Sequence, residues 1–385
     1  MMEIESEKSF EGLPQSLVAE MLSRYKELGD NLIEQFNETQ KAKYKIRNLL
    51  EGKDLLKKEG DILGSHAYPT TCGIDGSYSI DRLLATDIVA IASVAIEGLT
   101  PPTERRFWPE PHHLCDIFTT NHSDLTFLSA RAVMFTMELE LAYNAPHDVI
   151  FLDGSLVTPL IHFNQAFSRI DEVPTNIADI LLKRIKNTLN YYKEILMPSR
   201  SDKIYVGIPK YTSRNEIATS IGLKNHEDKS MLSFTMDGGE VVGPIDLVKP
   251  SDYWHFNKRL IDINKGITDD IISAITRLRI IYYKPYSYMP TLRIEAPATI
   301  TENRNRLSIL LEAVKLQCLP SILEPYPLYL ADRMVRHLGS ALPAIRRAVV
   351  QDMIQNTVFI SQRGIQKEIV DIFLGMHSYR TEQGG

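Results

Sequence analysis

The sequence contains few cysteines, and their placement argues against both disulfide bonds and a zinc site. The three cysteines, Cys72, Cys115 and Cys318, lie far apart and form no CxxC pair. Disulfide-stabilised secreted domains and closed zinc sites both require cysteines at short, regular spacings. The cysteine pattern therefore favours a reducing compartment.

The sequence also lacks a long hydrophobic run. The longest strongly apolar stretch, residues 88–96, contains a serine and is far shorter than the roughly 20 residues that a transmembrane helix needs. The first ten residues are acidic, whereas a signal peptide begins with basic residues followed by apolar ones. We therefore expect a cytoplasmic protein with no membrane partner.

Neither sign of charge dominates the composition. With 43 Lys and Arg against 49 Asp and Glu, the net charge of −6 gives no general attraction to nucleic acid or to anionic membranes. A polyanion must therefore be bound by local basic patches or with the help of a partner. At 385 residues, with 44% hydrophobic and 24% charged residues, the chain is typical of a globular protein with one large domain or two smaller ones.

Several widespread catalytic motifs are absent. No GxxxxGKS/T, GxGxxG, GxSxG or HExxH sequence occurs, so P-loop, Rossmann, α/β-hydrolase and zincin mechanisms lack their signature. His112, His113, Cys115 and His122 have no standard zinc spacing, and the proline-rich segment 100–121 around them has no periodicity. We predict a long surface loop for this segment.

Helical periodicity is strong near the N-terminus. In residues 17–50, apolar side chains such as Val18, Leu28 and Phe36 recur at steps of three and four, which predicts a helix with one buried face. Gly29 and Asp30 mark a candidate break in this helix. We predict an N-terminal helical arm over residues 1–60, which either packs on the body or serves in dimerisation or partner docking.

After residue 69, helices and strands mix without a strict βαβ rhythm. This pattern predicts an α/β domain over residues 61–345, with a mixed central sheet flanked by helices, and a C-terminal helical extension over residues 346–385. The domain is expected to open with a hairpin of strands at 71–77 and 87–94, and residues 233–248 to form a hairpin or loop. Further strands are expected at 148–152, 203–208, 279–283 and 291–296, and helices at 124–143, 177–196, 269–278, 304–317, 330–339, 345–355 and 365–375.

A short motif occurs twice in this domain. Gly-Ile-Asp-Gly-Ser at 73–77 and Phe-Leu-Asp-Gly-Ser at 151–155 both place an aspartate at the end of an apolar strand, before a glycine that frees the backbone. If the two strands are neighbours, Asp75 and Asp153 converge, and two adjacent carboxylates repel unless a proton or a cation lies between them. The pair therefore favours a divalent-metal site, although each motif taken alone is an ordinary Asp-Gly turn.

Other charged residues are candidates for the same site. Glu138 and Glu140 lie on the helix before the second motif, about 200° apart around its axis, so only one of them can face the sheet. We choose Glu138 because it shares a helix face with Arg131. Asp332 lies at a helix start, where it is either a further metal ligand or a helix N-terminal charge. Lys210 follows a predicted strand and is either a phosphate contact or a solvated lysine.

Together these segments resemble the NurA family of nucleases, which work with the hexameric DNA translocase HerA. The resemblance extends over residues 68–347 and rests on the order and spacing of its motifs. The motifs are Gly-Ile-Asp-Gly-Ser at 73–77, Glu-Leu-Glu-Leu-Ala at 138–142, Val-Ile-Phe-Leu-Asp-Gly-Ser-Leu at 149–156, Val-Gly-Ile-Pro-Lys at 206–210 with Thr-Ser-Arg at 212–214, Leu-Arg-Ile-Glu at 292–295 and Tyr-Pro-Leu-Tyr-Leu-Ala-Asp at 326–332.

The resemblance implies an RNase H-like core, a homodimer, and cleavage of DNA with manganese or magnesium. It matches Asp75 and Asp153 to the two metal-binding aspartates of the family. It matches Glu138 to the acidic helix residue, with Glu140 as the competing register. The implied activity is that of a metal-dependent deoxyribonuclease, a 5′–3′ exonuclease and single-strand endonuclease, that acts with a HerA-type ATPase in DNA end processing or anti-phage defence.

The chain departs from the family pattern at two positions. Asp332 falls where many archaeal members have a histidine, and Glu324 falls where some have a tyrosine. Aspartate is a competent ligand for hard metal ions, so Asp332 stays in the predicted ligand set with the three matched residues. These four residues are expected to hold two ions for phosphodiester hydrolysis, with Lys210 offsetting charge on the scissile phosphate.

Two alternatives come from other functional classes. A catalytically silent adaptor that binds the same kind of ATPase is favoured by the two departures and disfavoured by the retained acidic residues. A nucleotide-dependent phosphotransferase or ATPase on a related core is favoured because Asp-Gly-Ser turns also cradle nucleotide phosphates. That second alternative predicts that the two halves of the chain are similar, whereas the sequence contains only one short repeated motif.

Overall fold

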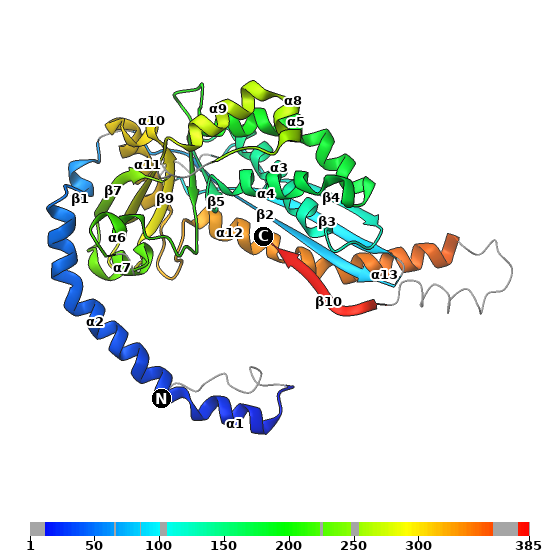
Figure 1. Ribbon diagram of the computed structural model, residues 1–385, viewed down its shortest axis with the longest axis horizontal. Coiled ribbons are helices and arrows are strands. Elements are labelled where there is room, and N and C mark those ends of the chain that lie inside the picture. Colours follow the sequence, from blue (N-terminus) through cyan, green and yellow to red (C-terminus); the bar gives the residue numbers. More distant parts are fainter. Residues whose placement is uncertain are drawn as a thin grey trace.

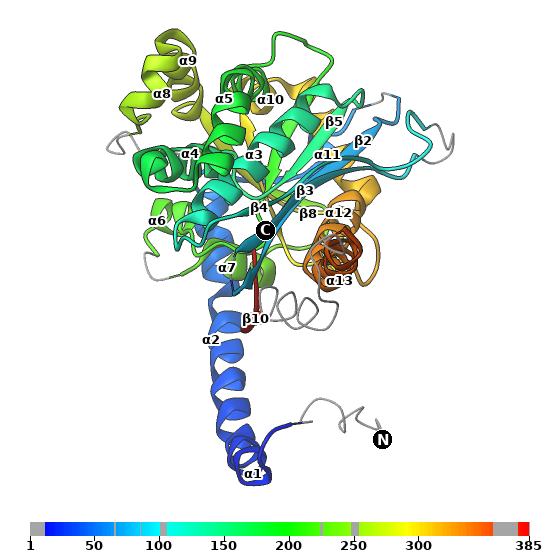
Figure 2. The ribbon, with the colours of Figure 1, turned by 90° about the vertical axis from the view of Figure 1, so that its right-hand side faces the viewer.

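The structure is a computed structural model of the chain, shown in Figure 1 and, after a quarter turn, in Figure 2. It describes residues 12–64, 67–84, 86–100, 106–223, 226–247, 254–356 and 376–384. Within these ranges the strands are β1 (Leu56–Lys58), β2 (Thr71–Leu83), β3 (Asp87–Glu97), β4 (His112–Thr120), β5 (Val149–Asp153), β6 (Ile204–Ile208), β7 (Glu240–Asp246), β8 (Leu278–Lys284), β9 (Leu292–Pro297) and β10 (Met376–Gly384).

These strands form one mixed sheet in the order β1-β7-β8-β9-β6-β5-β2-β3-β4, and β10 pairs with β2. Strand β5 runs parallel to both β2 and β6, while the other pairs along this path are antiparallel. The expected mixed central sheet flanked by helices is confirmed. The opening hairpin is also confirmed, because β2 and β3 pair in antiparallel register from Cys72 opposite Glu97 to Arg82 opposite Asp87.

Helices cover both faces of the sheet (Figure 2). The helices are α1 (Gln15–Ser23), α2 (Tyr25–Glu51), α3 (Thr126–Asn144), α4 (Thr158–Ser168), α5 (Thr175–Leu196), α6 (Glu216–Ser220), α7 (Asp228–Thr235), α8 (Lys258–Ile263), α9 (Lys265–Ile275), α10 (Ala298–Thr301), α11 (Arg304–Gln317), α12 (Tyr326–Arg336) and α13 (Leu338–Asn356), with short 3₁₀ turns at Glu59–Asp61 and Ile170–Glu172.

Strand β2 is covered on both sides, by α3 on one face and by α12 on the other. All of its residues except Arg82 are buried, and β3 is nearly as buried. Strands covered on both faces carry near-continuous apolar runs instead of alternating ones, which explains the run at 88–96. None of the helices in the described ranges has the length and hydrophobicity that a bilayer crossing requires.

The surface loop predicted for residues 100–121 is wrong in its second half. His112–Thr120 forms β4, which pairs with β3 along its whole length. Strand β4 lies at the edge of the sheet and is mostly exposed or half-buried, so it carries polar side chains where an inner strand would carry apolar ones. Edge strands often carry such polar residues, and the apolar alternation that marks a strand is therefore weak.

The N-terminal helical arm is confirmed, but its break and its packing differ from expectation. The helix is interrupted at Arg24, and Gly29 continues inside α2. Figures 1 and 2 both show the arm projecting away from the body. Only its C-terminal part is buried, whereas the side chains of Leu28 and Leu32 are 60% and 65% exposed. The arm therefore presents apolar side chains that the described chain does not cover.

Other segments also depart from the expected boundaries. β1 lies within the segment expected to form the arm but pairs with β7, and residues 233–248 contain the end of α7 and the strand β7. The helix expected at 330–339 is divided between α12 and α13. After α13 the chain was expected to be helical, yet β10 is a strand. The helix expected at 365–375 lies outside the described residues.

Candidate metal centre

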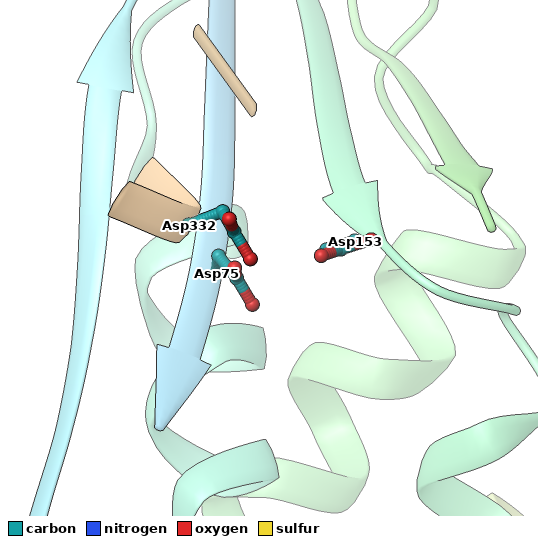
Figure 3. A group of neighbouring side chains, drawn as sticks. All are labelled: Asp75, Asp153 and Asp332. Carbon is teal, nitrogen blue, oxygen red and sulfur yellow. The ribbon is translucent and has the colours of Figure 1, made fainter. Parts of the chain in front are cut away.

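The sheet register places the two repeated motifs side by side. Strands β2 and β5 are parallel, with Ile74 opposite Leu152, so Asp75 and Asp153 come next on neighbouring strands. Asp332 reaches the same place from α12. Each of the three aspartates offers one carboxylate oxygen, and these oxygens lie within 4.8 Å of one another (Figure 3). The structure thus brings together three of the four predicted metal ligands.

Two glycines of the first motif allow these close approaches. A β-carbon on Gly73 would lie 2.5 Å from the backbone nitrogen of Leu328, near the start of α12. A β-carbon on Gly76 would lie 2.6 Å from Oε1 of Glu138. Both distances are far too short for nonbonded atoms. Glycine at 73 therefore lets α12 carry Asp332 to the sheet, and glycine at 76 leaves room for the glutamate.

Glu138, the fourth predicted ligand, is buried under Gly76 on the α3 side of β2. It lies outside the group of three aspartates but lines the same cleft. Glu140, the competing residue, lies 3.0 Å from Arg184 in an ion pair and does not line that cleft. The geometry thus favours Glu138 over Glu140 as the helix residue near the site, and its role as a ligand stays a prediction.

Lys210 lies among the carboxylates. Its Nζ is 2.9 Å from Oδ2 of Asp153, 2.9 Å from Oδ1 of Asp332 and 3.3 Å from Oε2 of Glu324. Glu324 was noted in the sequence only as a departure from the family pattern, and its position directly before Pro325 and α12 was the one signal that pointed to it. Lys210 is in the predicted site, but its ammonium faces carboxylates, and its contact with a phosphate stays a prediction.

Burial and repulsion between neighbouring carboxylates raise the pKa values of Asp75, Glu138 and Glu324. Burial and the charge of Asp153 raise the pKa of Asp75 to about 8. Burial and the neighbouring aspartates raise the pKa of Glu138 well above its usual value. Burial raises the pKa of Glu324 to about 7, although Lys210 opposes the shift. Burial lowers the pKa of Lys210, but Asp153, Asp332 and Glu324 together outweigh that effect and the net pKa is raised.

These shifts predict that the metal-free protein becomes less stable as the pH rises. The pKa of Asp75 is about 8 in the folded chain and about 3.9 in an unfolded one, so between these values the folded state holds a proton that the unfolded state has released. The free energy of unfolding should therefore fall as the pH rises to 8, most clearly above about pH 6.5, because below it the lowered pKa of His162, about 4, acts in the opposite direction. Thermal unfolding in a chelating buffer measures this fall, and a flat or rising profile would contradict it.

A buried ion-pair network supports the turn after Asp153. Oε2 of Glu295 accepts hydrogen bonds from the Ser155 hydroxyl at 2.5 Å and the Leu156 amide at 3.1 Å. Its other oxygen is 3.0 Å from Nε of Arg293, whose Nη1 is 3.0 Å from Glu216. Residues 292–295 form one of the sequence motifs, but their pattern does not predict this role, because the partners lie on two other segments, the turn after β5 and α6.

The acidic residues line a cleft with a volume of about 1380 Å³. Arg131, Arg214 and Arg336 line it as well, together with Tyr211, whose side chain is 92% exposed. Phosphate groups are bound by cationic side chains, and unpaired bases stack on exposed aromatic rings. The cleft thus places arginines and an exposed aromatic ring beside a larger number of acidic residues.

The three aspartates fit a hard divalent cation. Opposite ligands of a magnesium ion lie about 4.2 Å apart, twice the metal–oxygen bond length, so oxygens within 4.8 Å of one another need only a small inward movement. Oxygen ligands are those that magnesium and manganese prefer. Asp75 is also buried with a raised pKa, so a cation beside it would relieve an unfavourable charge.

The histidines and cysteine considered for zinc do not form a metal site. His112, His113 and Cys115 lie on β4, and Nδ1 of His122 lies 2.7 Å from Oδ1 of Asp87. Among the described residues, the three aspartates are the one group of acidic, histidine or cysteine side chains with the spacing of a metal site.

No protein-family model matches the chain, and no curated protein matches it in sequence. Solved structures do match. The NurA nuclease from Sulfolobus solfataricus has a TM-score of 0.54 and 13% identity over 86% of this chain and 98% of its own. NurA with manganese has a TM-score of 0.56 and 13% identity over 89% of this chain and 99% of its own.

The chain has the fold of the NurA nucleases. Because both chains are covered almost completely, the likeness includes the whole NurA architecture and not one shared motif. The RNase H-like fold that the sequence resemblance implied is thereby confirmed. At 13% identity the likeness shows the fold, and the chemistry has to be argued from the residues in the cleft.

Proposed function

We propose that the protein is a divalent-metal-dependent deoxyribonuclease that hydrolyses phosphodiester bonds in this cleft. The observation that carries the proposal is the convergence of Asp75, Asp153 and Asp332, on a NurA fold, in a cleft that Arg131 and Arg214 also line. Carboxylates at the centre suit a metal ion, and arginines around them suit a phosphate backbone. Neither feature alone requires a nuclease, but a metal site within a polyanion-binding cleft does favour one.

The residues have distinct roles in this proposal. Asp75, Asp153 and Asp332 would hold manganese or magnesium, with Glu138 as the predicted fourth ligand and two ions as the predicted number. When bound, the metal would supply an activated water and stabilise the leaving oxygen. The chain's own residues would position the reacting groups, because Glu295 fixes the turn after Asp153 and the arginines would align the DNA strand.

A homodimer, a HerA-type translocase as partner, 5′–3′ polarity and a cytoplasmic role in end processing or anti-phage defence are further parts of this proposal. They come from the sequence resemblance, and the exposed apolar arm supports a protein contact.

Replacing Leu28 and Leu32 together with glutamate is expected to reduce the molar mass from that of two chains to that of one. Light scattering of the full chain measures this, and an unchanged dimer mass would contradict a role of the arm in dimerisation.

Arg214→Ala is expected to weaken DNA binding to a similar extent for unrelated sequences. Arg214 lines the cleft and is exposed, which is typical of a phosphate contact. The slope of log affinity against log salt should fall by about one. Binding is measured by fluorescence anisotropy with calcium in an Asp153→Asn background. Arg277→Ala, at an exposed arginine outside the cleft, is the matched control, and equal losses in both variants would contradict the assignment.

The activity itself is tested with purified protein, manganese, and labelled linear single-stranded, linear double-stranded and circular DNA, with and without a HerA-type partner. Metal-dependent degradation that disappears in Asp153→Asn is the expected result. Intact circles would indicate a requirement for ends, and cut circles would indicate endonuclease activity. If the wild-type chain is inert on every substrate even with the partner, the nuclease proposal fails and a silent adaptor replaces it.

A further inference from the structure

We propose that Lys210 is a built-in competitor for one of two cation positions in the cleft. Its ammonium group occupies the position bounded by Asp153, Glu324 and Asp332, so that a divalent ion enters there only by displacing it. The position beside Asp75 stays accessible to an ion. This role rests on the proposed nuclease function, because it concerns how the same cleft takes up its metal.

Lys210 is held firmly in that position. Its side chain is 16% exposed, and its Nζ lies 2.9, 2.9 and 3.3 Å from carboxylate oxygens of Asp153, Asp332 and Glu324. Its backbone carbonyl accepts a hydrogen bond from Nζ of Lys229, and Pro209 stiffens the chain between β6 and the lysine. A lysine anchored in this way stays among the carboxylates.

The two positions differ in how their negative charge is compensated. Asp332 is contacted by Lys210 and also by Nε of Arg336 at 2.9 Å. In the part of the chain that the structure describes, neither Asp75 nor Glu138 forms an ion pair with lysine or arginine. The first ion should therefore bind with the higher affinity beside Asp75. A second ion has to break three existing ion pairs, which should weaken its binding by at least about tenfold.

Calorimetric titration of manganese into the full-length metal-free protein tests this role. The wild-type chain should bind one ion tightly and a second at least about tenfold more weakly, and Lys210→Met should tighten the second. The matched control is Lys315→Met, which removes another part-buried lysine, paired with Glu59 at 2.6 Å outside the cleft, and should leave both affinities unchanged. If the wild type binds two ions with equal affinity and Lys210→Met changes neither affinity, the proposed role of Lys210 is overturned while the nuclease proposal stands. No binding at all would overturn the nuclease proposal itself.

A second measurement needs no variant and applies even if Lys210→Met fails to fold. Lysines of the wild-type protein are acetylated with an amine-reactive ester at increasing manganese concentrations, and the modified sites are mapped by mass spectrometry. Acetylation of Lys210 should rise as the second ion binds, because the displaced amine is released from its carboxylates, while acetylation of Lys315 should not change. Constant acetylation of Lys210 while two ions are bound would overturn the proposal.

Discussion

Replacing Asp75 with asparagine is expected to lower the rate of DNA cleavage by at least about a thousandfold. A metal ion supplies several kcal/mol of transition-state stabilisation, and each 1.4 kcal/mol corresponds to about tenfold in rate. Asp75 lies in the three-aspartate group and is the most buried of its members. Single-turnover cleavage of labelled DNA at saturating manganese measures the chemical step without a contribution from product release.

The loss of cleavage activity in Asp75→Asn should not come from unfolding. Because the pKa of Asp75 is raised to about 8, its charge destabilises the metal-free fold at that pH, and Asp75→Asn should be at least as stable as the wild type there. Asp116→Asn, which removes a carboxylate paired with Arg184 outside the cleft, is the matched control and should cleave normally. Cleavage by Asp75→Asn within tenfold of the wild type would contradict the assignment of this residue to the metal site.

Arg293→Met is expected to lower the free energy of unfolding by about 3–5 kcal/mol. Arg293 is 1% exposed and pairs with Glu216 and Glu295, which are also buried. Removing the guanidinium leaves both carboxylates without their cation in a region of low dielectric constant. Urea denaturation monitored by circular dichroism gives the change in the free energy of unfolding.

Arg169→Met is the control for this substitution, because Arg169 pairs with Glu172 on the surface and such pairs contribute at most about 1 kcal/mol. Replacing Glu216 and Glu295 with glutamine alongside Arg293→Met should recover much of the loss, since the uncompensated charges are then gone. A loss below 1 kcal/mol in Arg293→Met would show that the network does not stabilise the fold. It would also contradict the role of this network in supporting the turn after Asp153.

The part of the site that the sequence could predict depends on local patterns. The two Asp-Gly-Ser motifs lie at strand ends, and parallel pairing of those strands in register is enough to bring Asp75 beside Asp153. The choice between Glu138 and Glu140 depended on helix periodicity, a local property as well. The mixed sheet and the arm were predictable for the same reason.

The rest of the site depends on contacts between distant segments. Glu324 meets Lys210, and Glu295 meets Ser155, only once β9, α12 and the turn after β5 are assembled. No periodicity in the sequence encodes such pairings. Strand β4 was missed for a different reason, because an exposed edge strand lacks the apolar alternation that identifies strands.

Anomalous diffraction from crystals soaked in manganese tests the central claim most directly. A peak within about 2.1 Å of carboxylate oxygens of both Asp75 and Asp153 is expected, and it should weaken in Asp153→Asn crystals soaked in the same way. A manganese-dependent nuclease whose crystals show no anomalous peak in the cleft, or show one only at other residues, would contradict the assignment of the active site.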